Sequence, residues 1–462
     1  MSYEILDNNK KFIVQRSEIE GRLDPKMALY NRKVKNSLYP KVKLKDVLVC
    51  KPQYGASEPG IPRSSIKEPR YIRITDIDEN GLISHDELGA TAKIIEDKYI
   101  LCENDILIAR SGATVGKAYI HKTASYTCFF AGYLIRFIIN TDKALPEYIF
   151  TYTQLNAYKE WVYAIQRPSG QPNINSEEYQ SLEIPLPNIE KQQVIVDVIK
   201  SAYLRRKQKE SEAQKLLDSI DAYILNELGI TLPEIKTDLK NRIFKVNRSE
   251  LEERLDPTVY KDGVKLSSNN CDNVRLSSVA YVNPTGTFKG KDIETPISFI
   301  PMESIDEIYS EISKLEDTTI ENASGFTKFK VGDLLWAKIT PCMQNGKSAI
   351  AKNLTNGLGC GSTEFFVMRP KDERLIIEYL HVILHMKCVR ETAKLYFGGS
   401  AGQQRVSSAF LENFNLPLPP KDKQIEIANH VYTIRQEAKA LQEEGKVLLE
   451  EAKRKVESMI IG

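Results

Sequence analysis

The chain has 462 residues, of which 42% are hydrophobic and 27% charged, as is typical of a globular protein with more than one core. Its 64 basic and 62 acidic side chains nearly balance, so net charge neither requires nor excludes a nucleic-acid partner. Seven cysteines with no Cys-x-x-Cys pair argue against a disulfide frame and a zinc ribbon. The first residues do not resemble a signal peptide, and no run of about 20 apolar residues occurs, so we expect a cytoplasmic protein with no membrane partner.

Two segments of the chain are repeated. FIVQRSEIEGRLDP at residues 12–25 returns as FKVNRSELEERLDP at residues 244–257, an offset of 232. The same offset carries IPLPNIEKQ at 184–192 onto LPLPPKDKQ at 416–424. A repeat of this length indicates two copies of a domain. Two equivalent modules in one polypeptide suit a ligand with two sites at a fixed separation, and DNA is the commonest such ligand.

Between these flanks, each half contains short apolar stretches broken by Gly, Pro, Asn and Asp, which predict strands and turns. One helical stretch follows the strands in each half, beginning at Pro146 and at Glu373. We therefore predict an α+β fold for both halves. The predicted strands lie in residues 69–77, 105–110 and 131–137 of the first half and 296–305, 333–339 and 364–370 of the second.

After each LPLP segment the hydrophobic period changes from 2 to 3.6 residues, with steps of four and three that are typical of a coiled-coil seam. A continuous helix from Glu190 to Leu228 would be roughly 58 Å long at about 1.5 Å per residue. The simpler interpretation of such an apolar stripe is a helix that packs only on its own domain. The presence of a second, matching helix favours pairing of the two helices with each other. If a pseudo-two-fold axis relates the halves, the helices run antiparallel. The predicted seam comprises Ile195, Ile199, Ala202, Leu216 and Ile220 in the first helix and Ile427, Val431, Ile434, Leu441 and Leu448 in the second.

These features together resemble the specificity subunits of type I restriction-modification systems. The resemblance is carried by the doubled plan, by the LPLP-x-x-x-x-Q segment that precedes each long helix, and by DILIARSGATVGKAYI at 105–120, answered by DLLWAKITPCMQNGKSAI at 333–350. It covers nearly the whole chain. It implies two target recognition domains that each read one half of a split double-stranded DNA site, and helices that hold the spacing and dock two methyltransferase subunits, with restriction or translocase subunits joining the complex.

The resemblance implies a chain with no catalytic role. In agreement, the sequence lacks the Asn/Asp-Pro-Pro-aromatic loop of adenine methyltransferases, and its nearest string is Asn283-Pro284-Thr285. We expect no metal and no cofactor on this chain, with S-adenosylmethionine, ATP and Mg²⁺ bound by the partner subunits. Two alternatives stay open: a coiled-coil adaptor whose globules bind no nucleic acid, and the specificity arm of another restriction or defence system.

The predicted domain plan follows the repeat. Residues 1–187 form the first recognition domain, 188–231 the central helix, 232–419 the second recognition domain and 420–462 the C-terminal helix, in a pseudo-two-fold arrangement with an antiparallel coiled coil.

Candidate DNA-contacting residues lie in loops rich in Gly, Ser, Gln, Asn and Arg, residue types that reach base edges and phosphates. Such residues also dominate ordinary turns. The candidates are Arg73, Arg110, Ser111, Lys117, Arg167, Ser169, Gln171 and Asn173 in the first half and Lys338, Thr340, Gln344, Lys347, Ser400, Gln403, Gln404 and Arg405 in the second.

Two further sequence patterns resemble sites of another kind, a phosphate-binding loop and a metal site. GATVGKA at 112–118 resembles a phosphate-binding loop, but only three residues separate its glycines, and Ala118 lacks the hydroxyl that binds magnesium. His381 and His385 with Cys388 suit a metal on one helix face, but Val382 occupies the position where a zincin has Glu. We favour a loop of the recognition domain in the first case and a packed helix in the second.

Overall fold

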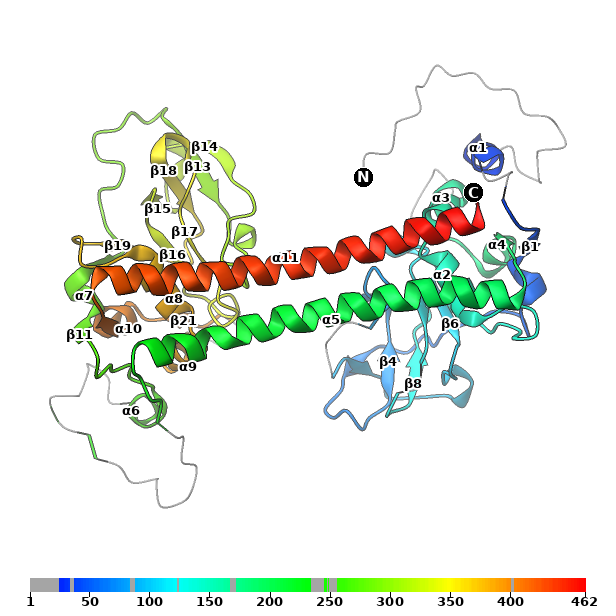
Figure 1. Cartoon of the computed structure of the whole chain (residues 1–462), viewed down its shortest axis with the longest axis horizontal. Helices are drawn as coiled ribbons and strands as arrows, with labels where there is room; N and C mark the ends of the chain where they lie inside the picture. The colour runs from blue at the N-terminus through cyan, green and yellow to red at the C-terminus, as the bar shows by residue number, and fades with distance from the viewer. Residues whose placement is uncertain are drawn as a thin grey trace. The chain divides into compact units, whose positions relative to one another are not determined.

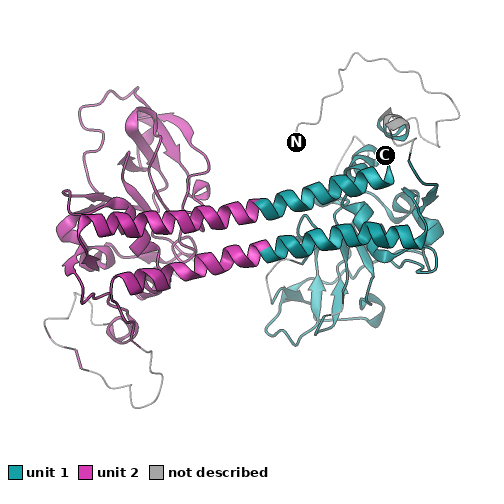
Figure 2. Ribbon diagram, viewed as in Figure 1, with its two compact units in different colours: residues 1–208, 444–462 teal, residues 209–443 magenta. Residues whose placement is uncertain are grey.

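A computed structural model describes residues 25–33, 37–83, 88–122, 124–166, 172–233, 245–246, 248, 256–399 and 403–462. The chain divides into two compact units (Figure 2). Unit 1 comprises residues 1–208 and 444–462, and unit 2 comprises residues 209–443. The two longest helices, α5 (Ile189–Glu227) and α11 (Lys421–Ile460), each contribute one part to unit 1 and one part to unit 2.

Unit 1 combines short strands with helices, most of which follow β9 in the sequence (Figure 1). Its strands are β1 (Lys41–Lys43), β2 (Gln53–Tyr54), β3 (Ile61–Pro62), β4 (Arg70–Ile72), β5 (Ala90–Thr91), β6 (Ile106–Ala109), β7 (Ala118–Ile120), β8 (Cys128–Phe130), β9 (Leu134–Phe137) and β10 (Glu183–Pro185). Its helices, besides the parts of α5 and α11, are α1 (Pro25–Lys33), α2 (Pro146–Thr153), α3 (Asn156–Ile165) and α4 (Ser176–Gln180), with 3-10 turns η2 (Leu44–Val47), η3 (Ile74–Asp76), η4 (Asp97–Tyr99) and η5 (Gly112–Thr114).

The strands of unit 1 form two four-stranded sheets, ordered β2-β9-β6-β7 and β3-β5-β4-β8, and a β1-β10 pair. All four residues of β6 are buried, because its alternate side chains point to opposite faces and both faces are covered. Ile106 and Ile108 enter the core that the helices cover, whereas Leu107 and Ala109 enter a second core with Ile72 of the other sheet. Helices, a first sheet and a second sheet therefore form successive layers.

Unit 2 has a similar order of elements with additional strands. Its strands are β11 (Asp272–Arg275), β12 (Ala280–Val282), β13 (Pro296–Ile300), β14 (Glu316–Thr319), β15 (Thr327–Lys330), β16 (Leu334–Ala337), β17 (Ser348–Ile350), β18 (Leu358–Gly361), β19 (Phe365–Pro370), β20 (Phe397–Gly398), β21 (Arg405–Val406) and β22 (Asn415–Leu418). Its helices are α6 (Pro257–Asp262), α7 (Leu276–Val279), α8 (Ile377–His385), α9 (Lys387–Lys394) and α10 (Ser408–Asn413), with 3-10 turns η8 (Met302–Ser304), η9 (Glu321–Ala323) and η10 (Thr355–Gly357).

The central sheet of unit 1 recurs in unit 2, whereas the second sheets differ in their edge strands, and unit 2 adds a β20-β21 pair. The order β12-β19-β16-β17 corresponds to β2-β9-β6-β7, and the pair β11-β22 corresponds to β1-β10. The second sheet, β14-β13-β18-β15, contains one parallel pair, β13 with β18, as its counterpart pairs β4 with β8 in parallel. The predicted mixed helix and sheet character of both halves is confirmed. The pseudo-two-fold arrangement and the domain boundaries stay predictions.

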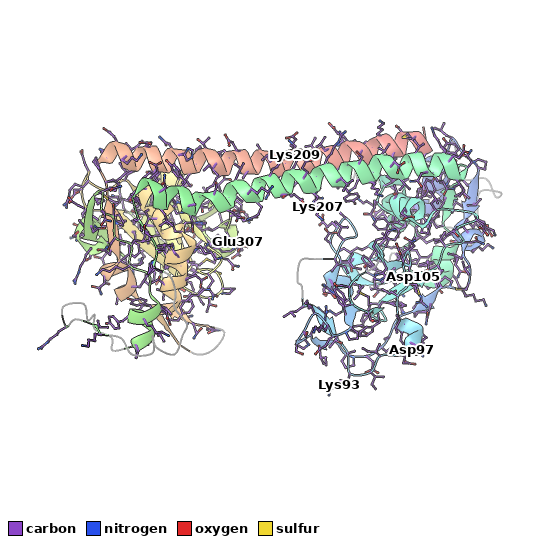
Figure 3. The ribbon with its side chains drawn as sticks, turned by 60° about the horizontal axis from the view of Figure 1, so that its bottom comes forward. Lys93, Asp97, Asp105, Lys207, Lys209 and Glu307 are labelled. Carbon is purple, nitrogen blue, oxygen red and sulfur yellow. The ribbon has the colours of Figure 1, made fainter. Side chains whose placement is uncertain are left out.

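A buried ion pair recurs in the central sheet of each unit. The carboxylate of Asp105 (labelled in Figure 3) lies 3.5 Å from a guanidinium nitrogen of Arg136. In unit 2, Arg369 donates two hydrogen bonds of 2.7 Å to Asp333, whose side chain is almost fully buried. Burial raises the pKa of Asp105 above its usual value even though Arg136 opposes that shift.

The glutamine of each LPLP-x-x-x-x-Q segment is fully buried and anchors the start of its long helix. Gln192 donates to the carbonyl of Pro187 and accepts from the amide of Leu145, both at 2.8 Å. Gln424 donates to Pro419 at 2.9 Å and accepts from Ile376 at 2.9 Å. Each glutamine thus ties a long helix to the segment that leads into α2 or α8.

Within each unit, α5 packs against α11. In unit 2, the ring of Tyr223 lies 4.1 Å from that of His430, and Glu227 pairs with Lys423, so the two helices run in opposite directions there. The seam positions are covered as an apolar stripe requires. Ile195, Ile199, Ala202, Ile220, Ile427, Val431 and Ile434 are buried, and Leu216, Leu441 and Leu448 are half-buried.

The buried stripe of α11 shifts by one residue after Gly445. Leu449 and Val456 are buried, whereas Lys455 is exposed. Gly445 lies directly against α5, and a Cβ placed there would be 3.5 Å from the Cα of Arg206. The glycine therefore marks the point where the two backbones approach closely in unit 1.

None of the helices in the described residues combines the length and the apolarity needed to cross a bilayer. All seven cysteines are free thiols, and Cys128 and Cys360 are buried.

Candidate nucleic-acid interface

In unit 1, the loop that follows β6 pairs with a segment much later in the sequence, just before α4. The amide of Ile174 donates to the carbonyl of Arg110 at 2.8 Å, and the amide of Gly112 donates to Pro172 at 2.9 Å. Ser111 and Asn173 form an antiparallel bridge between these two bonds. We call this pairing the unit 1 junction, residues 110–112 with 172–174.

Unit 2 contains the same pairing, the unit 2 junction, residues 338–340 with 404–406. Val406 donates to the carbonyl of Lys338 at 2.9 Å, and Thr340 donates to Gln404 at 3.0 Å. Ile339 and Arg405 form the bridge. Asn173 and Arg405 are related by the offset of 232 that relates the repeated segments, whereas Ser111 and Ile339 are related by an offset of 228, so the chain between the two sides of the junction is four residues longer in unit 2. The sequence predicted that both segments face one ligand, and the structure brings them side by side.

The side chains at the unit 1 junction combine one cation with exposed aromatic rings. The guanidinium of Arg110 lies 4.9 Å from the centre of the Tyr54 ring, and its backbone amide donates to Tyr133 at 3.0 Å. Tyr133 is 66% exposed, and Asn173 is also exposed. Arginine stacked on tyrosine beside an amide side chain suits contacts to bases and phosphates.

The side chains at the unit 2 junction differ. The guanidinium of Arg405 donates to both carboxylate oxygens of Glu364, at 2.9 and 2.8 Å. These bonds hold the pKa of the Glu364 carboxyl below its usual value. Lys338 lies over the Phe366 ring at 5.6 Å, and Thr340 donates to the side chain of Gln344 at 3.0 Å. The ion pair fixes the plane of Arg405, as bidentate recognition of a base or phosphate requires.

The family model for the type I restriction modification DNA specificity domain matches the sequence twice. The two matches cover residues 70–216 and 269–450, which together exceed half of the chain. The chain belongs to this specificity family.

Curated members share part of their sequence with this one. The EcoEI specificity subunit of a type I restriction enzyme from Escherichia coli is 36% identical over 159 residues, which are 33% of this chain and 26% of that protein. The EcoAI specificity subunit from the same species is 35% identical over 183 residues, 38% of this chain and 29% of that protein. This chain thus matches less than a third of the length of either relative.

A solved structure shares the fold. A chain from a structure described as "Structural basis underlying complex assembly and conformational transition of the type I R-M system" has a TM-score of 0.50 and 18% identity, covering 91% of this chain and 96% of that one. The fold shared with that chain therefore extends over most of the present chain.

Three basic residues among the DNA-contact candidates form hydrogen bonds with groups outside the two junctions. Lys117 donates to the carbonyl of Ile77 at 2.6 Å, just after η3, and Lys347 donates to Met302 at 3.2 Å, the first residue of η8. Arg73 donates to both carboxylate oxygens of Asp76. Both lysines bond a backbone carbonyl at the 3-10 turn after the parallel strand of their unit, although at different ends of the turn, which gives them a structural use besides any contact with phosphate.

The remaining candidates are one exposed glutamine and four residues that the structure does not describe. Gln403 is exposed, and its carbonyl accepts from Arg405. Arg167, Ser169, Gln171 and Ser400 lie outside the described residues.

The Gly-Lys motifs that resemble a phosphate-binding loop are explained by the turns in which their glycines lie. Gly116 and Gly346 have φ values of +87° and +89°, in the left-handed region that favours glycine. A Cβ at Gly116 would also lie 2.8 Å from Val162. These glycines close the turns that lead into β7 and β17, so the Gly-Lys pairs serve the fold of the specificity domains.

His381 and His385 are packed in the core. The imidazole of His381 lies 3.0 Å from the Ser348 hydroxyl, and that of His385 lies 3.3 Å from the carbonyl of Glu307. Burial lowers the pKa of both, to about 3 for His381. In the described part of the chain, no three His, Cys, Asp or Glu side chains are grouped as a metal site would need.

Sequence reasoning missed Tyr54, Tyr133 and Glu364. Glu364 lies 41 residues from its partner Arg405, and Tyr54 lies in β2 whereas Arg110 follows β6, so no local pattern joins either pair. Tyr133 and Glu364 fall within the predicted strands at 131–137 and 364–370, and that position was their one sequence signal.

Proposed function

We propose that this chain is the DNA-specificity subunit of a type I restriction-modification complex, in which each unit reads one half of a split, asymmetric DNA site. One observation carries the proposal: the two junctions share their backbone hydrogen bonds but present different side chains. Arg110 with tyrosines and Arg405 with glutamate are unlike recognition surfaces on one scaffold. Unlike surfaces select unlike half-sites, because base contacts depend on the side chains presented.

The proposed subunit has no catalytic role. Its contribution is to place partner subunits on a chosen sequence: two methyltransferase subunits docked on the long helices, with restriction or translocase subunits joining them. S-adenosylmethionine, ATP and Mg²⁺ belong to those partners in this proposal. Membership in the specificity family supports it.

Affinity would come from basic side chains on phosphates and specificity from side chains on base edges. Binding should weaken with salt, with a slope of log K on log salt of roughly −0.9 per phosphate contact. Among the candidates, Lys117 and Lys347 suit phosphate contacts, whereas Asn173, Gln344, Gln403 and Gln404 suit base edges.

The experiment is a selection from random duplexes with the chain assembled on its cognate methyltransferase. We expect enrichment of two short sequence blocks separated by a spacer of fixed length and variable sequence. Enrichment of no sequence, from a complex shown to be assembled and soluble, would overturn the proposal and favour the coiled-coil adaptor.

A further inference from the structure

A cavity of about 340 Å³ lies inside unit 2, away from its junction. Four segments line it: the loop after η8, the end of β17 with the loop that follows, the helix α8, and the part of α11 around Val431 and Gln436. This is the loop that carries Glu307, labelled in Figure 3. Aliphatic side chains form much of the wall, among them Ile312, Leu315 and Val382.

The deepest charged group in the wall is Arg435 on α11, which is 7% exposed. Among the residues that the structure describes, its guanidinium has neither a hydrogen bond nor an ion pair, and its Nε is buried without a partner. A buried cation without a counter-charge is costly, so proteins normally pair it. Burial lowers the pKa of Arg435 to about 10, and the nearby charge of Arg390 acts in the same direction, whereas the charges of Asp221 and Asp306 oppose the shift without a hydrogen bond to Arg435.

Two hydroxyls of the same wall are also without partners. The Tyr309 hydroxyl and the Ser310 hydroxyl are both buried and unbonded within the described residues. With the Arg435 guanidinium they make three unsatisfied donors around one cavity. Donors without acceptors define a site for an electron-rich group.

The acidic groups nearby are engaged elsewhere or turned to solvent. Glu311 pairs with Lys439 at 2.5 Å and accepts from Gln436 at 3.3 Å. Asp306 accepts from two backbone amides of its own loop, and Asp221 accepts from the amide of Lys387 at 2.8 Å.

The last carboxylate of the wall, Glu378, belongs to the first turn of α8 and has no ion pair among the described residues. Lys352 adds a second cation to the wall. The wall thus carries two cations, Arg435 and Lys352, and two carboxylates, of which Glu311 is already paired with Lys439, so Arg435 and the two hydroxyls are its unsatisfied donors.

The repeat supplies an internal comparison. At the repeat offset, the residue equivalent to Arg435 is Tyr203, whose hydroxyl donates to the carbonyl of Asn80 at 3.2 Å. The first half therefore fills the equivalent position with a satisfied neutral side chain. The unpaired arginine is particular to unit 2.

We propose that this cavity binds a small organic anion, with its phosphate or carboxylate group held by Arg435, Tyr309 and Ser310 and its body against the aliphatic wall. Its volume lies within the range of small-molecule sites, and charge paired with an apolar wall is their usual chemistry. Such a ligand would join the loop after η8 to α11 and so stabilise unit 2. The site is independent of DNA reading.

The test measures the thermal unfolding of the full chain with phenyl phosphate, benzoate or inorganic phosphate, at ionic strength matched with sodium chloride. We expect phenyl phosphate or benzoate to raise the midpoint with concentration, by about 3 °C or more near saturation. Calorimetric titration should give one site per chain. No rise with either organic anion would overturn the proposal, and equal affinity for inorganic phosphate would overturn the organic part of it.

Three variants locate the site. Arg435→Gln should weaken binding at least about tenfold and should fold, because it removes an unpaired buried charge. Tyr309→Phe removes only a hydroxyl and should weaken binding about threefold to tenfold, which keeps the test decisive if Arg435→Gln does not fold. Lys455→Gln, at an exposed position of the same helix, should leave binding unchanged. Unaltered binding to both cavity variants would overturn the assignment.

Discussion

At the scale of single residues, the repeated motifs act through buried polar contacts. Gln192 and Gln424 have no exposed surface, and each satisfies backbone groups on two segments. The sequence indicated that these glutamines matter, since both copies of the motif keep them. It did not indicate their partners, which lie 47 and 48 residues earlier in the chain.

Gln424→Ala should destabilise unit 2. The substitution leaves the amide of Ile376 and the carbonyls of Arg374 and Pro419 without partners, and each unpaired buried group costs about 1–3 kcal/mol. We expect a loss of roughly 2–4 kcal/mol in the free energy of unfolding, measured with urea. The matched control is Gln193→Ala, because Gln193 is exposed and bonds only to Asp197 among the described residues. Equal effects of the two substitutions would contradict the anchoring role.

Buried histidines should make unit 2 sensitive to acid. The pKa of His381 falls to about 3 in the fold, chiefly through burial, and lies near 6.5 when unfolded. The unfolded state therefore binds the proton more readily, so stability is complete above about pH 6.5 and declines as pH falls toward 3, by about 1.4 kcal/mol per pH unit for one histidine. His381→Gln should reduce this slope between about pH 6 and pH 4 in urea titrations. His430→Gln, at an exposed position, should not, and an unchanged slope in His381→Gln would oppose this account.

At the scale of elements, periodicity predicted the helices well. The central helix was expected from Glu190 to Leu228 and runs from Ile189 to Glu227, because a stripe with 3.6-residue spacing reports directly which face is buried. The one-residue shift after Gly445 was not expected, since it depends on how closely the two backbones approach. Each of the six predicted strand stretches contains a strand, namely β4, β6, β9, β13, β16 and β19. The other strands and the pairing were not predicted, because sheet order depends on contacts distant in sequence. The ion pair of Asp105 with Arg136 was missed for the same reason.

The close approach of α5 and α11 limits the size of the side chain that position 445 of α11 can accommodate. Gly445→Ala gains helix propensity of about 1 kcal/mol but places its Cβ 3.3 Å from the Arg206 Cγ, so we expect a net change within about 1 kcal/mol. Gly445→Leu should cost roughly 1–3 kcal/mol through overpacking. Urea unfolding of the two variants measures the difference. Lys455→Leu, at an exposed position of the same helix, should change stability by less than about 0.5 kcal/mol. A neutral Gly445→Leu would mean that the helices are farther apart than the structure has them.

At the scale of the whole molecule, duplication explains both the structure and the proposed function. The order of the central sheet, the buried ion pairs, the anchoring glutamines and the junction bonds occur twice, while the exposed side chains at the junctions differ. Shared interiors preserve a fold, and divergent surfaces allow two different ligand sequences. The repeat could be read from the sequence because its flanks are nearly copied, whereas the base sequence recognised depends on side-chain poses that no local pattern encodes.

The most direct measurement is genome-wide methylation mapping in a host that expresses the cognate methyltransferase alone, with this chain, and with the Arg110→Ala variant. The account predicts a new split, asymmetric methylated motif that appears only with the chain. The variant, checked for soluble assembly, should relax the sequence of one half of the motif and leave the other half unchanged. No new motif with all subunits assembled, or equal relaxation of both halves, would contradict the account.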